Sequence, residues 1–342
     1  MSKKKKHHYV PRFYLKRFSI EEQGKFLGLF NHESEVFVQK AALKHQAYGN
    51  FLYGEDDEIE NALACMEGTM AKLFHCWIDK KLFYPPPAHT NGFKLLQRFI
   101  LYQIFRTPKA GDNMLDQMTI SLKAMLKEHK PHLYDHIKSG RLEHENSVLL
   151  TFLYSIGREH LLNFLGCKFL VNLTSLPFIM SDSPIVLYNQ LMEKAQNYIG
   201  ATALTSKGLQ IFFPIHPRLM LCLYDENVYE FGNGCKNCFG VESKNDVDQL
   251  NGLQLINCRS QVFFNEIVSK DYIMNLVSNY SRFRTTKKSI NQLFKKGSRK
   301  FQFISSEDPK INLNVDFFDL KANPANFSHD LVSPRHPSMN GQ

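Results

Sequence analysis

Two adjacent histidines near the start of the chain are the side chains best suited to acid–base chemistry. His7 and His8 carry imidazole rings, which gain and lose a proton near neutral pH. In an extended segment neighbouring side chains point to opposite sides, so only one of the two can face a site. We expect that one to be His8. The alternative is that the rings are structural and bond to the main chain.

Two carboxylates and one guanidinium are candidates for the same site. Glu67 falls among apolar positions at helical spacing, where a carboxylate needs a partner, and Arg106 or His8 could be that partner. Arg106 itself could complement a helix dipole or form a forked contact with a phosphate. Asp182 follows a strand-like run and could be functional. In its Ser-Asp-Ser-Pro turn it could equally hydrogen-bond to its own backbone.

The chemistry that these side chains would support together is cleavage of a phosphodiester. Glu67 and Asp182 could hold a divalent metal such as Mg²⁺ or Mn²⁺. Without a metal, His8 would act as the base and Arg106 would stabilise charge on the phosphate. The sequence has no Gly-rich phosphate loop, so we expect no nucleotide cofactor. The predicted catalytic set is His8, Glu67, Arg106 and Asp182.

Positive charge is concentrated in two short stretches. The net charge is +9, yet residues 1–20 hold seven Lys and Arg and residues 281–300 hold eight, with no acid in either stretch. Such strips on an otherwise mildly acidic chain predict contact with polyanions, nucleic acid first. The alternative is a solvated tail and a solvated helix face. The nucleic-acid contacts that we predict are Arg12, Arg17, Arg282, Arg284, Lys287 and Lys288.

Hydrophobic periodicity changes along the chain. The opening residues 7–19 carry four aromatic rings, so we expect them to dock on the helical part, with Tyr9, Phe13 and Phe18 buried and Lys3 to Lys6 free. Short apolar runs around a turn predict a hairpin over 25–39. Helical spacing predicts helices at about 58–78, 91–106, 111–129 and 146–165. Strand-like runs then follow from 167 to 224 and at 261–265, with helices at 246–258 and 271–294.

The segregation of helices from strands predicts an α+β fold. We expect a helical N-terminal half packed on a small, mainly antiparallel sheet from the C-terminal half. The expected organisation is a single globular domain over 1–310 and an irregular C-terminal tail over 311–342. Within the domain, the helical part covers about 56–165, the sheet-rich part about 166–270 and the C-terminal helix about 271–294.

Composition narrows the class of protein. Hydrophobic residues make up 43% of the 342 residues, which is enough for a large core, and no apolar run is long enough to span a bilayer. Seven cysteines, an odd number, indicate free thiols in a reducing compartment, so we expect a cytoplasmic protein. Cys235 and Cys238 have the spacing of metal ligands, but no second pair follows at zinc-site spacing.

Six short segments stand out as motifs. They are His8-Tyr9-Val10-Pro11, Phe13-Tyr14-Leu15 with Phe18, Arg106-Thr107-Pro108, Ser181-Asp182-Ser183-Pro184-Ile185-Val186, Phe213-Pro214-Ile215-His216-Pro217, and Leu250-Asn251 with Gln254. Together they resemble a bacterial family catalogued as domain of unknown function 4238. The likeness covers about residues 7–270, and it is specific as a set although each motif alone is weak. This chain has Ser183 where the family usually has Asn before the proline.

The resemblance implies no established chemistry, but some members of the family resemble single-gene defences against bacteriophage. The first hypothesis is therefore an anti-phage effector, a nuclease-like phosphodiesterase acting on nucleic acid. The alternative is a non-catalytic sensor that binds nucleic acid or a phage protein. We expect nucleic acid as a partner, a phage protein as a possible trigger, and no membrane.

Overall fold

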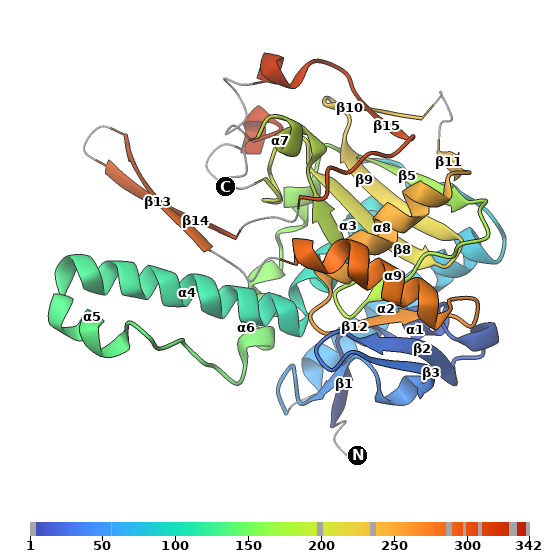
Figure 1. Ribbon diagram of the computed structural model, residues 1–342, viewed down its shortest axis with the longest axis horizontal. Helices are drawn as coiled ribbons and strands as arrows, with labels where there is room; N and C mark the ends of the chain where they lie inside the picture. The colour runs from blue at the N-terminus through green and yellow to red at the C-terminus, as the bar shows by residue number, and fades with distance from the viewer. Residues whose placement is uncertain are drawn as a thin grey trace.

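The computed structural model describes residues 5–55, 57–196, 201–232, 237–284, 289–296, 299–306, 310–327 and 334–339. It shows a body of packed sheets and helices from which a helical arm projects (Figure 1). The helices in the described residues are α1 (Arg12–Lys16), α2 (Glu58–Ile78), α3 (Asn91–Phe105), α4 (Pro108–His129), α5 (Pro131–Ile137), α6 (Ser147–Ser155), α7 (Gln190–Lys194), α8 (Lys244–Asn257) and α9 (Lys270–Tyr280).

Two sheets form the framework. The larger has the strand order β11-β5-β9-β8-β7, and only β11 and β5 are parallel neighbours. The second is antiparallel, with the order β3-β2-β12-β6. The strands are β1 (Lys6–His8), β2 (Phe26–Asn31), β3 (Val36–Ala42), β4 (Tyr48–Asn50), β5 (Leu165–Asn172), β6 (Met180–Ser181), β7 (Val186–Tyr188), β8 (Gln210–His216), β9 (Leu219–Asp225), β10 (Tyr229–Phe231), β11 (Cys238–Val241), β12 (Gln261–Phe264), β13 (Ser289–Lys296), β14 (Arg299–Ser306) and β15 (Phe318–Leu320).

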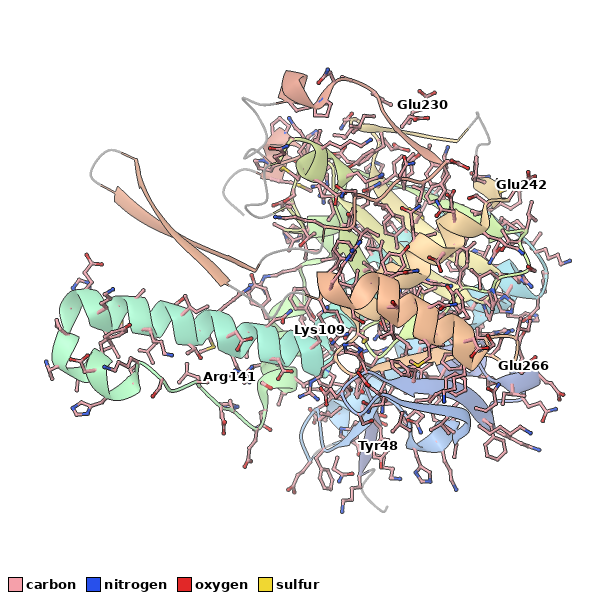
Figure 2. All side chains as sticks on the ribbon, in the orientation of Figure 1. Tyr48, Lys109, Arg141, Glu230, Glu242 and Glu266 are labelled. Atoms are coloured by element: carbon pink, nitrogen blue, oxygen red, sulfur yellow. The ribbon has the colours of Figure 1, made fainter. Side chains whose placement is uncertain are left out.

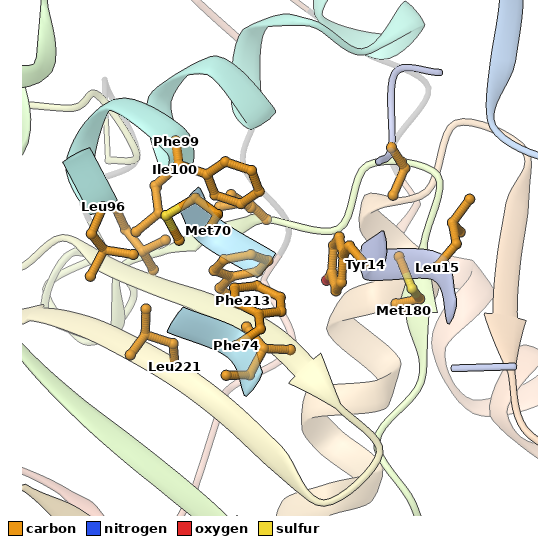
Figure 3. Packing of buried hydrophobic residues seen from close by; sticks show 14 of the residues in the cluster. Tyr14, Leu15, Met70, Phe74, Leu96, Phe99, Ile100, Met180, Phe213 and Leu221 are labelled. Carbon is orange, nitrogen blue, oxygen red and sulfur yellow. The ribbon is translucent and has the colours of Figure 1, made fainter. Parts of the chain in front are cut away.

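The N-terminal segment is anchored in the largest apolar cluster (Figure 3). Tyr14 and Phe18 are fully buried, which confirms that the segment docks on the body. The Tyr14 ring contacts Phe74 on α2 and Phe213 on β8, with ring centroids 5.8 and 5.3 Å apart. Its hydroxyl donates to the carbonyl of Pro214. The segment therefore joins the helical layer to the larger sheet.

Two details of this segment differ from expectation. Tyr9 and Phe13 pack against the same cluster but are half-buried rather than buried. Lys6 is not in a free tail, because it begins β1 and pairs with Asn50 of β4. Strand pairing therefore begins at Lys6, the residue before the two histidines.

The larger sheet is covered on both faces, as alternation along its strands requires. Phe213 of β8 faces the cluster that contains α2, α3 and α6, whereas Phe212 faces the opposite side. On that opposite side, Val247 and Leu250 of α8 pack against the sheet. Farther along α8, Leu255 belongs to a third cluster formed with the second sheet and α9. Helix α8 therefore lies where the two sheets meet.

Proline sets the junction between α3 and α4. Because Pro108 disfavours a helical conformation for the preceding residue, the first helix was expected to end near Arg106. Thr107 is extended, with φ −91° and ψ 150°, and its hydroxyl accepts from the N–H of Ala110 at 3.3 Å. Pro108 then begins α4, which runs outward with α5 as the arm seen in Figure 1.

The sequence-based expectations need two corrections in the first half of the fold. The structure is mixed α/β, but its strands do not come only from the C-terminal half, because β2 and β3 pair with β12 and complete the second sheet. The hairpin over 25–39 is confirmed. The helix expected over 146–165 ends at Ser155, since Gly157 has a φ of +75°.

The C-terminal part also differs. The helix expected over 271–294 ends at Tyr280, and Ser289–Lys296 forms strand β13 instead. Residues after 310 are not only an irregular tail: Leu313 and Phe318 are buried, and β15 pairs with β10. The spacing of apolar residues over such a short segment does not distinguish a helix from a strand. Pairing with a neighbouring strand determines which of the two forms.

Phe74→Ala should destabilise the protein by about 3–5 kcal/mol, because it opens a cavity among rings from α1, α2, α3 and β8. The free energy of unfolding in urea measures this. Tyr84→Ala is the control: Tyr84 is 69% exposed, and its removal should change stability by less than about 0.5 kcal/mol. Equal effects of the two substitutions would contradict this account of the core.

Candidate functional site

Arg106 is fully buried and engages two neighbouring side chains. Its Nη1 donates to Glu67 Oε1 at 2.7 Å, which is one of the two pairings expected for Glu67 from its apolar setting. Its Nε and Nη2 both donate to Gln103 Oε1, at 2.9 and 2.6 Å. Gln103 in turn donates to the carbonyl of Tyr9 at 2.9 Å. The guanidinium therefore ties α2 and α3 to the N-terminal segment.

The two histidines point to opposite sides, but the inward one is His7. It is fully buried and stacks on Tyr53, with ring centroids 5.6 Å apart, and its Nδ1 accepts from the N–H of Tyr53 at 3.3 Å. His8 is half-buried beside Tyr48. Burial, assisted by the charge of Arg12, lowers the pKa of His8 to about 4. Its imidazole is therefore neutral, and only weakly basic, at pH 7.

Asp182 is buried and holds a turn that is distant in sequence. Its two carboxylate oxygens accept from the backbone N–H groups of Arg259, Ser260 and Gln261, at 2.7, 2.8 and 3.0 Å. Burial raises the pKa of Asp182, while these hydrogen bonds act in the opposite direction. The structural alternative, in which Asp182 hydrogen-bonds to backbone groups, therefore describes this side chain. The backbone groups belong to the segment that links α8 to β12, whereas the sequence suggested the backbone of the turn that contains Asp182 itself.

Of the four catalytic candidates, the structure joins Glu67 to Arg106. Within the described residues, no hydrogen bond or ion pair links His8 or Asp182 to that pair or to each other. The residues suggested for Mg²⁺ or Mn²⁺ do not fit a metal as placed, because Glu67 is paired with Arg106 and Asp182 accepts from three N–H groups. The described part of the chain contains no group of three or more metal-ligating side chains.

The predicted cationic contacts are dispersed. Arg17 is committed to Asp79 through two bonds of 2.7 and 2.6 Å, and Arg12 is exposed at the start of α1. Arg282 lies over the ring of Phe283, at 4.8 Å. Of the four that lie in the described residues, Arg284 alone lines the cavity described next. Lys287, Lys288 and Cys235 lie outside the described residues.

A cavity of about 1500 Å³ lies at the base of the arm. Its wall combines the α3–α4 junction, α6, the turn after β6, the end of α8 and the segment after α9. Lys109 marks this place near the start of α4 in Figure 2. Two of the motif segments therefore meet here, since Thr107, Ser183 and Ile185 all line the cavity.

The cavity wall interleaves cations with aromatic rings. Arg158 lies over the ring of Tyr154, with 4.1 Å between the guanidinium carbon and the ring centroid, and Tyr154 is 55% exposed. Among the described residues that line the cavity, the carboxylates are Glu33 and Asp112. The cationic lining residues are Lys109, Arg158, Arg259 and Arg284.

Hydrogen bonds brace one side of the cavity. Lys109 Nζ donates to the main-chain and side-chain oxygens of Asn257, at 2.7 and 2.5 Å. The Asn257 amide donates to the carbonyls of Ser183 and Ile185, at 2.5 and 3.1 Å. Apart from Arg284, sequence reasoning missed the charged and aromatic residues of this wall. The motifs around Arg106 and Asp182 were the available signal, because each is adjacent to a lining residue.

The fold and cavity define a mixed α/β protein with a cationic and aromatic cavity at the base of a helical arm. The chain belongs to the family described as protein of unknown function (DUF4238), whose match covers residues 6–267. No curated protein and no solved structure matches the chain. Among the described residues, no helix has both the length and the apolar character needed to cross a membrane.

Glu67→Ala should lower the free energy of unfolding by about 2–4 kcal/mol, because it leaves the buried Arg106 charge without its carboxylate. The expected cost is below the full value for a buried pair, since the Glu67 side chain is 23% exposed. Urea denaturation measures it. Asp135→Ala is the control: its side chain is 71% exposed, and the change should cost less than about 1 kcal/mol. A similar cost for both would argue against a structural role of the Glu67 pair.

His8 should make stability depend on pH between about 4 and 6.5. In this range the unfolded chain binds a proton at His8 that the folded protein does not bind, so stability falls as the pH falls. The stability advantage of the wild type over His8→Gln should shrink by about 1–3 kcal/mol between pH 7 and pH 4, allowing for partial exposure of the ring. A constant difference across this range would show that His8 titrates normally.

Proposed function

We propose that this protein binds single-stranded nucleic acid in the cavity at the base of the arm. The supporting observations are that Arg158 lies over the ring of Tyr154 and that Phe283 and Arg284 also line the cavity. Unpaired bases stack on aromatic and guanidinium planes, and cations beside those planes contact the phosphates. Bases in a duplex are already stacked on one another, so the wall favours an unpaired strand.

The charges of the two arginines support an anionic ligand. Arg158 donates to the carbonyl of Tyr154, and Arg284 donates to the carbonyls of Leu255 and Arg259. These acceptors are neutral, and neither guanidinium forms an ion pair with a described carboxylate. Burial, together with the charge of Arg284, lowers the pKa of His32 nearby. The described lining residues of the cavity include four cations and two carboxylates, so the lining carries a net positive charge.

Binding is better supported than cleavage. Phosphodiester hydrolysis needs a base, a metal or another stabilising charge within reach of one phosphate. The pKa of His8 is too low for an efficient base at neutral pH, and Glu67, Arg106 and Asp182 are engaged in the contacts that hold the fold. The binding module is thus the proposal, and the nuclease is the competing hypothesis.

A role in defence against bacteriophage is the cellular context that we propose. It rests on the resemblance of some family members to single-gene defences. In that context the strand bound in the cavity would come from the phage or from host RNA made during infection, and a phage protein could act as the trigger.

Tyr154→Ala should weaken binding of a short single-stranded RNA by roughly 5- to 100-fold, because each base stacked on an aromatic ring contributes about 1–3 kcal/mol. The slope of log K against log salt should not change. Arg158→Gln should instead flatten that slope by about 0.7, the value for one phosphate contact on a single strand. Fluorescence anisotropy at several salt concentrations measures both quantities.

Lys40→Gln is the matched control, since Lys40 is exposed on β3 and does not line the cavity. It should leave affinity and slope close to those of the wild type. Absence of binding by the wild-type protein would refute the proposal. Cleavage of the RNA or of plasmid DNA, with or without Mg²⁺ or Mn²⁺, would favour the nuclease instead.

A further inference from the structure

Ser183 lines the cavity and carries a buried hydroxyl that has no hydrogen-bond partner among the described residues. The residue is only 6% exposed. Buried hydroxyl groups nearly always have a partner, because an unpaired one has lost its hydrogen bonds to water without replacement. The unpaired Oγ therefore indicates that a bound ligand would supply the missing hydrogen-bond partner.

The backbone around Ser183 is held from several sides. Its N–H donates to Ser181 Oγ at 3.3 Å, and its carbonyl accepts from Asn257 Nδ2 at 2.5 Å. The preceding Asp182 is bonded to the turn that begins at Arg259. The backbone that carries the Ser183 hydroxyl is thus held in place by the fold, as recognition of a ligand group requires.

The charges near Ser183 are balanced, unlike those near Arg158. Arg259 Nε donates to Asp112 at 2.8 Å, and the charge of Lys109 acts on the buried Asp182 carboxylate. Two cations thus accompany two carboxylates on this side of the cavity. A further charged group would find little net attraction here, whereas an uncharged hydrogen-bonding group would meet a free hydroxyl.

We infer that Ser183 recognises an uncharged polar group of the bound strand, a sugar hydroxyl or a nucleobase edge, while the phosphates lie toward Arg158 and Arg284. This inference rests on the proposed function and makes Ser183 a specificity-determining residue of the same cavity. A buried hydroxyl can both donate and accept, so it matches either source. Matched probes distinguish the two sources.

The first measurement uses the free protein. Ser183→Ala should leave the melting temperature unchanged or raise it, because it removes an unpaired polar atom and breaks no hydrogen bond. Ser181→Ala is the matched control, two positions away in the same segment. Its hydroxyl bonds to Gln254 Oε1 at 3.0 Å and accepts from Ser183, so its loss should lower the melting temperature. A clear loss of stability in Ser183→Ala would overturn the inference.

The second measurement compares RNA and DNA strands of one sequence, about ten nucleotides long, and the four RNA homopolymers. Ser183→Ala should bind the preferred probe roughly 5- to 100-fold more weakly than the wild type, whereas Lys40→Gln, which changes an exposed residue outside the cavity, should bind like the wild type. A smaller preference for RNA over DNA would assign the contact to the sugar hydroxyl. A smaller preference among the homopolymers would assign it to a base edge.

The outcomes separate this inference from the proposed function. If the wild type binds none of these probes, the proposed function and the inference both fail. If the wild type binds the probes and Ser183→Ala binds each of them as tightly as the wild type does, only the inference fails. An unchanged affinity of Tyr154→Ala together with weaker binding by Ser183→Ala would support recognition at Ser183 without stacking on Tyr154.

Discussion

One buried carboxylate determines how the wall of the cavity is assembled. Removing the Asp182 carboxylate from water is costly in free energy, and three backbone N–H groups offset that cost through charge-assisted hydrogen bonds. These donors belong to the turn between α8 and β12. By holding that turn against the segment after β6, Asp182 places Ser183 and Arg259 on the same cavity.

Arg106 has the equivalent role for the helical side. It is fully buried, and its guanidinium bonds to Glu67 and Gln103 and lies over the ring of Phe99. Gln103 passes the connection to the main chain of Tyr9. These buried hydrogen bonds therefore orient α3 relative to the N-terminal segment. The α3–α4 junction, which follows Arg106, contributes Thr107 and Lys109 to the lining of the cavity.

These two clusters explain why residues that resemble a catalytic set serve the fold instead. Charged side chains are rarely buried unless they are paired, and such pairing consumes the atoms that catalysis would use. The side chains left for a ligand are those at the cavity surface. They are arginines bonded to neutral carbonyls, exposed rings such as Tyr154, and the unpaired hydroxyl of Ser183.

The sequence by itself determined the local elements. Thr90 and Thr107 cap α3 and α4, Pro108 separates those helices, and the aromatic N-terminal segment docks on the core, because each of these depends on neighbouring residues or on burial of large rings. The pairing of Glu67 with Arg106 was one of two alternatives that burial of a carboxylate predicted.

The tertiary structure decided the remaining features. Asp182 finds its partners 77 to 79 positions along the chain, and no local pattern specifies such a contact. The strand β13 arises where periodicity predicts a helix, since strand pairing overrides weak local preference. Whether a serine hydroxyl is paired depends on every atom packed around it. For this reason Ser183, and the cavity that it lines, could be recognised only in the folded chain.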